Sequence, residues 1–393
     1  MISHIFSAVY HDRVYIWGRV AQGSLNGPNI FGRLSALTGR MSQGCFPPEE
    51  LRLQIYADDP CSVVRGAPSR RTRIVATILM LWRVMGYSLA FHKGQLGRDL
   101  SWIGYQLKLT EDYIEVAIKD SFMKEFLTST QQLNKVNMIR GRDLRRYTGQ
   151  ANHISGLLFA WRPFLDTLWA ALAKSQRKGE TTHTYVWKRQ IKPSLQWFLC
   201  FLEGQRNHLC RQWWYSSFHA AAAEITMILD ASPYGFGGVL IVNNVVLAYF
   251  ADIISNHDVR IMKHQPGTAE GQQTWEALCL LIALRAWGMH WMTRRSLLCI
   301  KSDNKAALTL VTKLKAKGTR SIIAKELGLL YAESSYEPRL ADHIPGVFNG
   351  LADCLSRLTS PDGAYSVPES LRAVSRTFIP SRPRSWYRSL KPR

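Results

Sequence analysis

The chain has 393 residues, 46% of them hydrophobic and 20% charged, which is typical of two or three folded domains and excludes a disordered chain. Its 50 Lys and Arg against 29 Asp and Glu give a formal net charge of +21, and this excess favours a polyanionic partner, nucleic acid ahead of an acidic membrane surface. Seven scattered cysteines without a Cys-x-x-Cys spacing argue against a zinc site or a disulfide framework. They favour a reducing intracellular location, cytoplasm or nucleus. Neither a signal peptide nor a membrane-spanning stretch is expected.

The first 118 residues are predicted to combine short strands with helices. Apolar and polar residues alternate up to Tyr56, which indicates a half-buried strand, and Ala57-Asp58-Asp59 follows as a tight turn. The elements expected here are a strand over 51–56, a returning strand over 60–64, a helix over 70–85 and a short strand over 102–107.

Residues 119–215 are rich in Lys, Arg and Trp and mostly helical in pattern. Two helices are expected over 144–173, broken near Arg162-Pro163, and another over 187–205, interrupted at Pro193. Residues 175–184 are polar and basic, which predicts a loop.

Residues 216–358 alternate between strand and helix patterns, and those from 359 onward form a tail with five prolines among Arg and Ser. The tail is predicted to be poorly ordered. In the α/β part, Asn243-Asn244 indicates a hairpin turn. The elements expected are strands ending at Asp230 and spanning 237–242, 245–250 and 297–301, an amphipathic helix over 275–287, and helices over 305–314 and 349–358.

Four acidic residues of the α/β part fall at strand ends or in what we predict to be first helical turns: Asp230, Glu276, Asp303 and Asp353. One sheet with these helices on it can bring them together, although clustered carboxylates repel one another without a cation. Two divalent ions about 3.5–4 Å apart, Mg²⁺ or Mn²⁺, would neutralise them and support phosphodiester chemistry. Any one of these acids is more often a helix cap or a surface group, and only the ordered set is specific.

This part of the chain resembles the ribonuclease H domain of retroelement reverse transcriptases. The motifs that carry the resemblance are Asp230-Ala231-Ser232 with Gly235-Phe236-Gly237-Gly238, Trp275-Glu276-Ala277-Leu278, Ser302-Asp303-Asn304-Lys305-Ala306, and His343-Ile344-Pro345-Gly346 leading to Asn349 and Ala352-Asp353-Cys354-Leu355-Ser356-Arg357. The resemblance implies an α/β domain with a mixed central sheet that cuts RNA in RNA–DNA hybrids. It also implies that the four carboxylates bind metal and that His343, ten residues before Asp353, assists product release or proton transfer.

The upstream segment Tyr56-Ala57-Asp58-Asp59 is similar to the Tyr-x-Asp-Asp turn of reverse transcriptases. The similarity implies a partial polymerase palm over 1–118 (α+β) and a helical thumb or connection over 119–215, before the ribonuclease H-like domain at 216–358 and the basic tail at 359–393. Asp58 and Asp59 would bind metal at a primer end. The residues implied to contact template–primer nucleic acid are Gln22, Gly23, Tyr56, Lys93, Trp102 and Gly104.

The family's first catalytic aspartate has no counterpart, because Asp12 is the only acid before Gln22-Gly23 and its neighbours do not match. The fingers subdomain is missing too, so we interpret the chain as an N-terminally truncated retroelement fragment, long-terminal-repeat-like or related, with ribonuclease H activity. The alternatives are a polymerase subunit completed by another chain, in an oligomer or with a separate fingers chain, and a non-catalytic nucleic-acid-binding remnant. No membrane partner is expected.

Phosphate contacts are expected from the stretch Arg140–Arg189 and from the basic tail. Trp161, Trp169 and Trp187 in or near that stretch either belong to a helical core or stack on bases.

Overall fold

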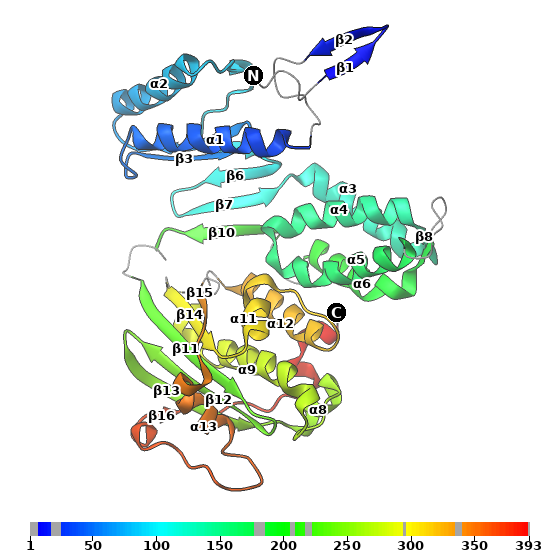
Figure 1. Ribbon diagram of the computed structural model, residues 1–393, viewed down its shortest axis with the longest axis vertical. Coiled ribbons are helices and arrows are strands. Elements are labelled where there is room, and N and C mark those ends of the chain that lie inside the picture. Colours follow the sequence, from blue (N-terminus) through cyan, green and yellow to red (C-terminus); the bar gives the residue numbers. More distant parts are fainter. Residues whose placement is uncertain are drawn as a thin grey trace. The chain divides into compact units, whose positions relative to one another are not determined.

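The computed structural model describes residues 7–16, 25–176, 185–204, 209–216, 222–293, 296–334 and 340–391. It divides into two compact units, residues 1–105 and 106–393 (Figure 1). Gln22 and Gly23 lie outside the described residues. None of the described helices is both long and apolar enough to cross a membrane.

The first unit is built around the hairpin expected at Tyr56-Ala57-Asp58-Asp59. Strand β3 pairs antiparallel with β4, and Tyr56 lies opposite Asp59, so Ala57 and Asp58 form the two-residue turn. Leu51, Ile74, Ile78 and Trp82 form its small buried core. The elements are β1 (Ser7–Tyr10), β2 (Arg13–Ile16), α1 (Gly27–Gly44), β3 (Leu51–Tyr56), β4 (Asp59–Val64), α2 (Pro68–Val84), η1 (Phe91–Lys93) and β5 (Asp99–Trp102).

The second unit begins with strands β6 and β7, which are followed by a helical bundle. The break predicted near Arg162 is confirmed, since α4 ends at Leu157 and α5 begins at Arg162. The interruption predicted at Pro193 is wrong, because α6 continues through this residue. The elements are β6 (Tyr105–Leu109), β7 (Tyr113–Ile118), α3 (Asp120–Lys135), β8 (Met138–Arg140), α4 (Gly141–Leu157), η2 (Phe159–Trp161), α5 (Arg162–Gln176), β9 (Tyr185–Trp187), α6 (Lys188–Leu202) and β10 (Cys210–Trp214).

The bundle has an aromatic core. Trp161 stacks on Phe198 with ring centroids 4.9 Å apart, and Phe126 stacks on Tyr147 at 4.7 Å. Trp161 is only 1% exposed, so it belongs to the core and is not available to stack on bases. Trp169 and Trp187 differ from it, because they are 46% and 49% exposed.

A six-stranded mixed sheet forms the centre of the remaining part of the second unit, as the resemblance implied. Its strand order is β15-β14-β11-β12-β13-β16. Strands β11, β12 and β13 pair antiparallel, while β14 runs parallel to both β11 and β15. Asn243 and Asn244 form the predicted turn with φ of +49° and +64°, which suits a tight hairpin. The strands are β11 (Ala223–Ala231), β12 (Gly235–Val242), β13 (Val245–Ile253), β14 (Ser296–Ser302), β15 (Leu340–His343) and β16 (Ser375–Arg376).

Helices cover both faces of this sheet. Helix α9 packs on β11 and β12 together with α11 and α12, and α13 covers the opposite face (Figure 1). The amphipathic character predicted for 275–287 is wrong, because every residue from Thr274 to Leu284 is buried. A helix enclosed on all sides needs no polar face. The helices are α8 (Asn256–Met262), η3 (Ala269–Gly271), α9 (Gln272–Ala286), α10 (Gly288–Trp291), α11 (Lys305–Lys313), α12 (Arg320–Glu333), η4 (Gly346–Phe348) and α13 (Gly350–Ser356).

The segment after α13 does not behave as the poorly ordered tail that its composition predicted. It contains η5 (Glu369–Leu371), η6 (Arg384–Trp386) and η7 (Arg388–Leu390). Arg382 is 2% exposed and forms ion pairs with Asp258 and Asp252, and the hydroxyl of Tyr387 donates to Asp258 at 2.6 Å. The expectation was wrong because prolines and arginines were judged without their buried partners on β13 and α8.

Candidate metal centre

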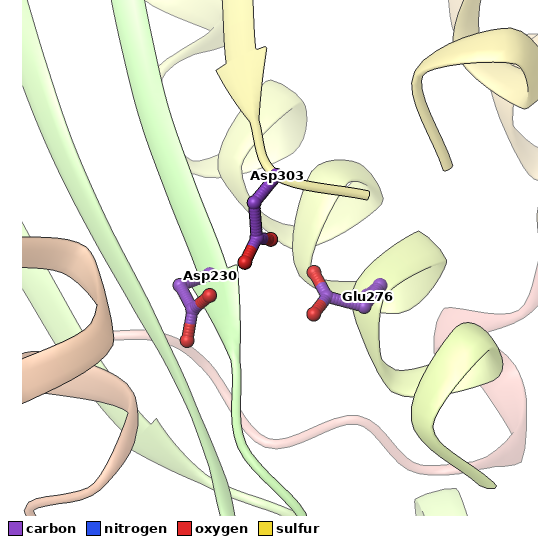
Figure 2. Close-up of side chains that lie close together, drawn as sticks. All are labelled: Asp230, Glu276 and Asp303. Carbon is purple, nitrogen blue, oxygen red and sulfur yellow. The ribbon is translucent and has the colours of Figure 1, made fainter. Parts of the chain in front are cut away.

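Three of the four predicted acids meet at one end of the sheet. Asp230 comes from β11, Glu276 from α9, and Asp303 from the residue directly after β14 (Figure 2). Each offers a carboxylate oxygen, and these three oxygens lie within 4.8 Å of one another. Asp230 and Glu276 are each 5% exposed, whereas Asp303 is exposed. Figure 2 shows the three carboxylates facing a common space.

The position of each acid follows from its own element. On β11, Met227 and Leu229 face the main core, so alternation turns Asp230 toward the α13 side of the sheet. Glu276 lies in the second turn of α9 and not in the first, as the sequence had suggested. The thiol of Cys279, one turn further on the same face of α9, donates to the carbonyl oxygen of Asp230 at 3.2 Å. This contact fixes α9 on β11 with Glu276 beside Asp230.

Asp303 is held where the chain leaves the sheet. Parallel pairing of β14 with β11 brings the carboxyl ends of both strands to the same edge. Asn304 caps α11 by accepting hydrogen bonds from the backbone N–H groups of Ala306 and Ala307, both at 3.0 Å. The cap turns the chain immediately after Asp303 and so sets its direction.

Helix α13 approaches the sheet closely because β12 has glycine where the two meet. A Cβ on Gly237 would collide with the backbone of Ala352 and Ser356. The small residues that the sequence places after Asp230 therefore serve to admit α13. The approach brings Ser356 and Asn349 to Asp230.

Neutral side chains orient the two buried carboxylates. Ser356 Oγ donates to Asp230 Oδ2 at 2.7 Å, and Asn349 Nδ2 lies 3.2 Å from Asp230 Oδ1. Gln272 Nε2 donates to Glu276 Oε1 at 3.1 Å and to the carbonyl oxygen of Ala231. Asn349 and Ser356 lie within motifs noted in the sequence, but no role was assigned to them. Gln272, four residues before Glu276, was not considered, although that spacing places the two on one helix face.

The pKa values of both buried acids are raised. Burial raises the pKa of Asp230 from 3.8 to about 6, the charges of Asp303 and Asp353 raise it further, and the hydrogen bond from Ser356 opposes the shift. Burial likewise raises the pKa of Glu276 well above its usual value, reinforced by Asp230 and Asp303. These shifts show a site that disfavours its own negative charge when it holds no cation.

Asp353 lies near the other three acids but outside their cluster. It occupies the first turn of α13, as predicted, and its Oδ1 accepts a hydrogen bond from Arg357 Nε at 2.7 Å. His343 is the exposed last residue of β15 and pairs in register with Ser302. The chain after it returns to the site, since a Cβ on Gly346 would be 3.5 Å from Asp303 Oδ2.

The donor set fits a hard divalent cation. All three clustered ligands are carboxylates, which Mg²⁺ and Mn²⁺ prefer, and no described Lys, Arg or His forms an ion pair with any of them. The side-chain oxygens of Asn349 and Gln272 are buried beside the cluster without a donor among the described residues. A cation would offset the burial and the mutual repulsion that raise both pKa values.

The residues assigned to polymerase chemistry lie in the first unit. Tyr56, Asp58 and Asp59 are exposed at the β3–β4 hairpin, and Lys93 is exposed in η1. Trp102 Nε1 donates to the carbonyl oxygen of Asp59 at 3.0 Å, and Gly104 lies in a turn with φ of +86°. Within the described ranges, no third acidic, Cys or His ligand joins Asp58 and Asp59 in a metal-binding cluster.

Comparisons with known proteins give distant likenesses to solved structures. No protein-family model matches the sequence, and no curated protein matches it. Among solved structures, the chain is similar to a foamy viral protease-reverse transcriptase in complex with an RNA/DNA hybrid, with a TM-score of 0.42 and 15% identity over 95% of this chain and 43% of the viral chain. The viral protein in complex with double-stranded DNA gives 0.40 and 15%, over 87% and 63%.

Ribonuclease H1 from the halophilic archaeon Halobacterium salinarum NRC-1 is also similar, with a TM-score of 0.26 and 14% identity over 36% of this chain and 99% of the archaeal chain. The chain spans less than half the length of the foamy viral protein in the complex with an RNA/DNA hybrid. Likenesses this distant carry no argument about function.

Proposed function

We propose that the chain is a divalent-metal-dependent nuclease that hydrolyses the RNA strand of RNA–DNA hybrids. One observation carries the proposal. Asp230, Glu276 and Asp303 come from three separate elements, and their carboxylate oxygens lie within 4.8 Å of one another, while no Lys, Arg or His among the described residues forms an ion pair with any of them. Folding such a cluster is unfavourable unless a metal ion completes it.

In this proposal the three clustered acids hold one or two Mg²⁺ or Mn²⁺ ions, and Asp353 contributes from α13. When bound, the metal supplies an activated water and stabilises the leaving oxygen of the phosphodiester. Ser356 and Asn349 hold both oxygens of Asp230, and Gln272 holds Glu276. These hydrogen bonds fix the ligands before the ion arrives, which limits the ordering cost of binding. His343 is proposed to assist product release from the exposed end of β15.

The substrate class has two supports. The formal net charge of +21 suits a phosphate backbone. The choice of an RNA–DNA hybrid comes from the resemblance to ribonuclease H motifs, and the cluster geometry alone is compatible with other phosphodiesters.

The deciding experiment incubates the purified chain with end-labelled hybrid, double-stranded RNA and double-stranded DNA, with Mg²⁺ or with excess chelator. Cleavage confined to the RNA strand of the hybrid and dependent on Mg²⁺ is expected. Cutting that persists in chelator would refute the metal site, and equal cutting of all three duplexes would refute the substrate assignment. Metal-dependent thermal stabilisation without any cleavage would favour a non-catalytic nucleic-acid-binding protein.

A polymerase role is a second candidate, and it rests on the exposed tip that carries Asp58 and Asp59. Two carboxylates supply only part of a metal site for triphosphate chemistry. We therefore propose this role only for an assembly in which another chain adds the remaining ligand.

A further inference from the structure

A second surface with chemistry of its own lies on the short two-stranded ribbon of β8 and β9. The strands pair antiparallel, with Met138 opposite Trp187 and Arg140 opposite Tyr185. The middle residues, Ile139 and Val186, are each 2% exposed and face the helical bundle. Because side chains alternate along a strand, the four outer residues share the opposite face.

This outer face leaves large aromatic groups in contact with solvent. Trp187 is 49% exposed, Tyr185 is 45% exposed and Met138 is 44% exposed. Burying these side chains against a partner would remove a large apolar surface from contact with water. Their ring faces also suit stacking on flat groups. The exposure of Trp187 contrasts with Trp161, which the same bundle buries.

Cations surround the ribbon. A recess of about 420 Å³ is lined by Trp187, Lys188, Arg189 and Lys192, together with Asn137. The guanidinium carbon of Arg189 lies 5.7 Å from the centre of the Trp187 ring, and Lys188 Nζ donates to the carbonyl oxygen of Asn134 at 2.9 Å. Within residues 137–146 and 185–192 the only acid is Asp143. The recess is therefore complementary to an anion.

We propose that the β8–β9 ribbon binds single-stranded nucleic acid. Bases stack on Trp187 and Tyr185, and Arg140, Arg189 and Lys192 contact the phosphates. Aromatic rings interleaved with cations form the usual platform for unpaired strands, whereas bases inside a duplex already stack on one another and leave no face free. The two lysines that line the recess, Lys188 and Lys192, argue against a protein partner, since the cores of protein interfaces are poor in Lys. The inference does not depend on the nuclease proposal.

Fluorescence anisotropy with short labelled oligothymidylate and oligouridylate, in chelator so that no strand is cut, tests the ribbon directly. Trp187→Ala is expected to weaken binding about 5- to 150-fold, the effect of losing one stacked base. Trp187→Phe should recover part of the loss. Trp169→Ala is the matched control, because Trp169 is 46% exposed on α5 and lies outside the ribbon; it should bind as the wild type does.

A salt series separates stacking from charge. Arg189→Gln should reduce the log–log salt slope by about 0.7 per lost phosphate contact, while Trp187→Ala leaves the slope unchanged. If Trp187→Ala does not fold, as judged by thermal melting, the Arg189→Gln and Lys192→Gln double variant provides the test.

Three outcomes would overturn the proposal. They are wild-type affinity in both the aromatic and the cationic variants, an equal loss in Trp169→Ala, or a loss of self-association without any change in oligonucleotide binding. The last result would assign the ribbon to a protein partner.

Discussion

Asp230 shows how one residue links folding to the proposed chemistry. It is buried against α13, receives hydrogen bonds from Ser356 and Asn349, and faces Glu276 and Asp303. The surroundings that prepare it to bind a cation also make its charge unfavourable in the metal-free protein.

Replacing Asp230 with Asn keeps the shape of the side chain but removes its charge. We expect hybrid cleavage to be lost and the metal-free protein to melt at a temperature a few °C higher, because a repelling buried charge has gone. Thermal melting in chelator and with Mg²⁺ measures this, and Mg²⁺ should stabilise the wild type more than the variant. Full cleavage by the variant would remove Asp230 from the proposed site.

The raised pKa of Asp230 also predicts a pH dependence of stability. Its folded-state pKa of about 6 lies above the ordinary 3.8, so between these values the folded protein binds more protons than the unfolded chain. Stability of the metal-free protein should therefore fall as pH rises through this window, by up to about 3 kcal/mol from this group. Asp230→Asn is the control, and the difference between the two unfolding free energies in chelator should grow from pH 4 to pH 7. A difference that stays constant would contradict the shift.

At the scale of elements, the C-terminal segment is part of the fold of the second unit. Arg382 is buried with Asp258, and the backbone N–H of Ser389 donates to Glu326, which also pairs with Arg285 at 2.5 Å. Trp197 of α6 donates to the carbonyl oxygen of Ser389 at 3.0 Å, so the segment also contacts the helical bundle. Arg382 is too buried to contact a phosphate, which corrects the role that composition suggested for it.

Arg382→Ala should destabilise the second unit by about 3–5 kcal/mol, because it leaves Asp258 buried without its partner. Urea unfolding followed by far-UV circular dichroism measures the change. Arg384→Ala, an exposed cation of the same segment, is expected to stay within about 0.5 kcal/mol of the wild type. Equal stability of both variants would show that the segment is dispensable, as a loose tail would be.

At the scale of the whole molecule, the two candidate metal-binding sets lie in different compact units. Asp58 and Asp59 belong to residues 1–105, and the three clustered acids belong to residues 106–393. Each set can therefore be disabled without changing the residues of the other unit.

The purified chain is expected not to extend a primer on an RNA or DNA template, because the described part of the chain brings no third ligand to Asp58 and Asp59. A gel-based extension assay with Mg²⁺ and all four deoxynucleotides checks this. Asp58→Asn should leave hybrid cleavage unchanged. Template-directed extension by the wild type that Asp58→Asn abolishes would show that this hairpin forms a working polymerase site.

The sequence alone determined the elements whose signals are local. Alternation predicted the strand that ends at Asp230, Asn243-Asn244 predicted the turn between β12 and β13, and the break near Arg162 separated two helices. Neighbouring residues contain these signals, because strand and helix periods and tight turns depend on short stretches of chain. The four ordered acids also indicated metal chemistry before any geometry was known. Helix α12 went unrecognised, since its buried residues (such as the consecutive Leu327, Gly328 and Leu329) cover several of its faces and leave no clear polar stripe.

Only the tertiary structure decided which of these groups meet. It placed Asp230, Glu276 and Asp303 together, left Asp353 paired with Arg357, and brought Ser356 and Asn349 to Asp230 across more than 100 residues of sequence. It also ordered the C-terminal segment around Arg382. Such contacts join distant parts of the chain, and their free energies depend on burial and partner charges that no local pattern contains.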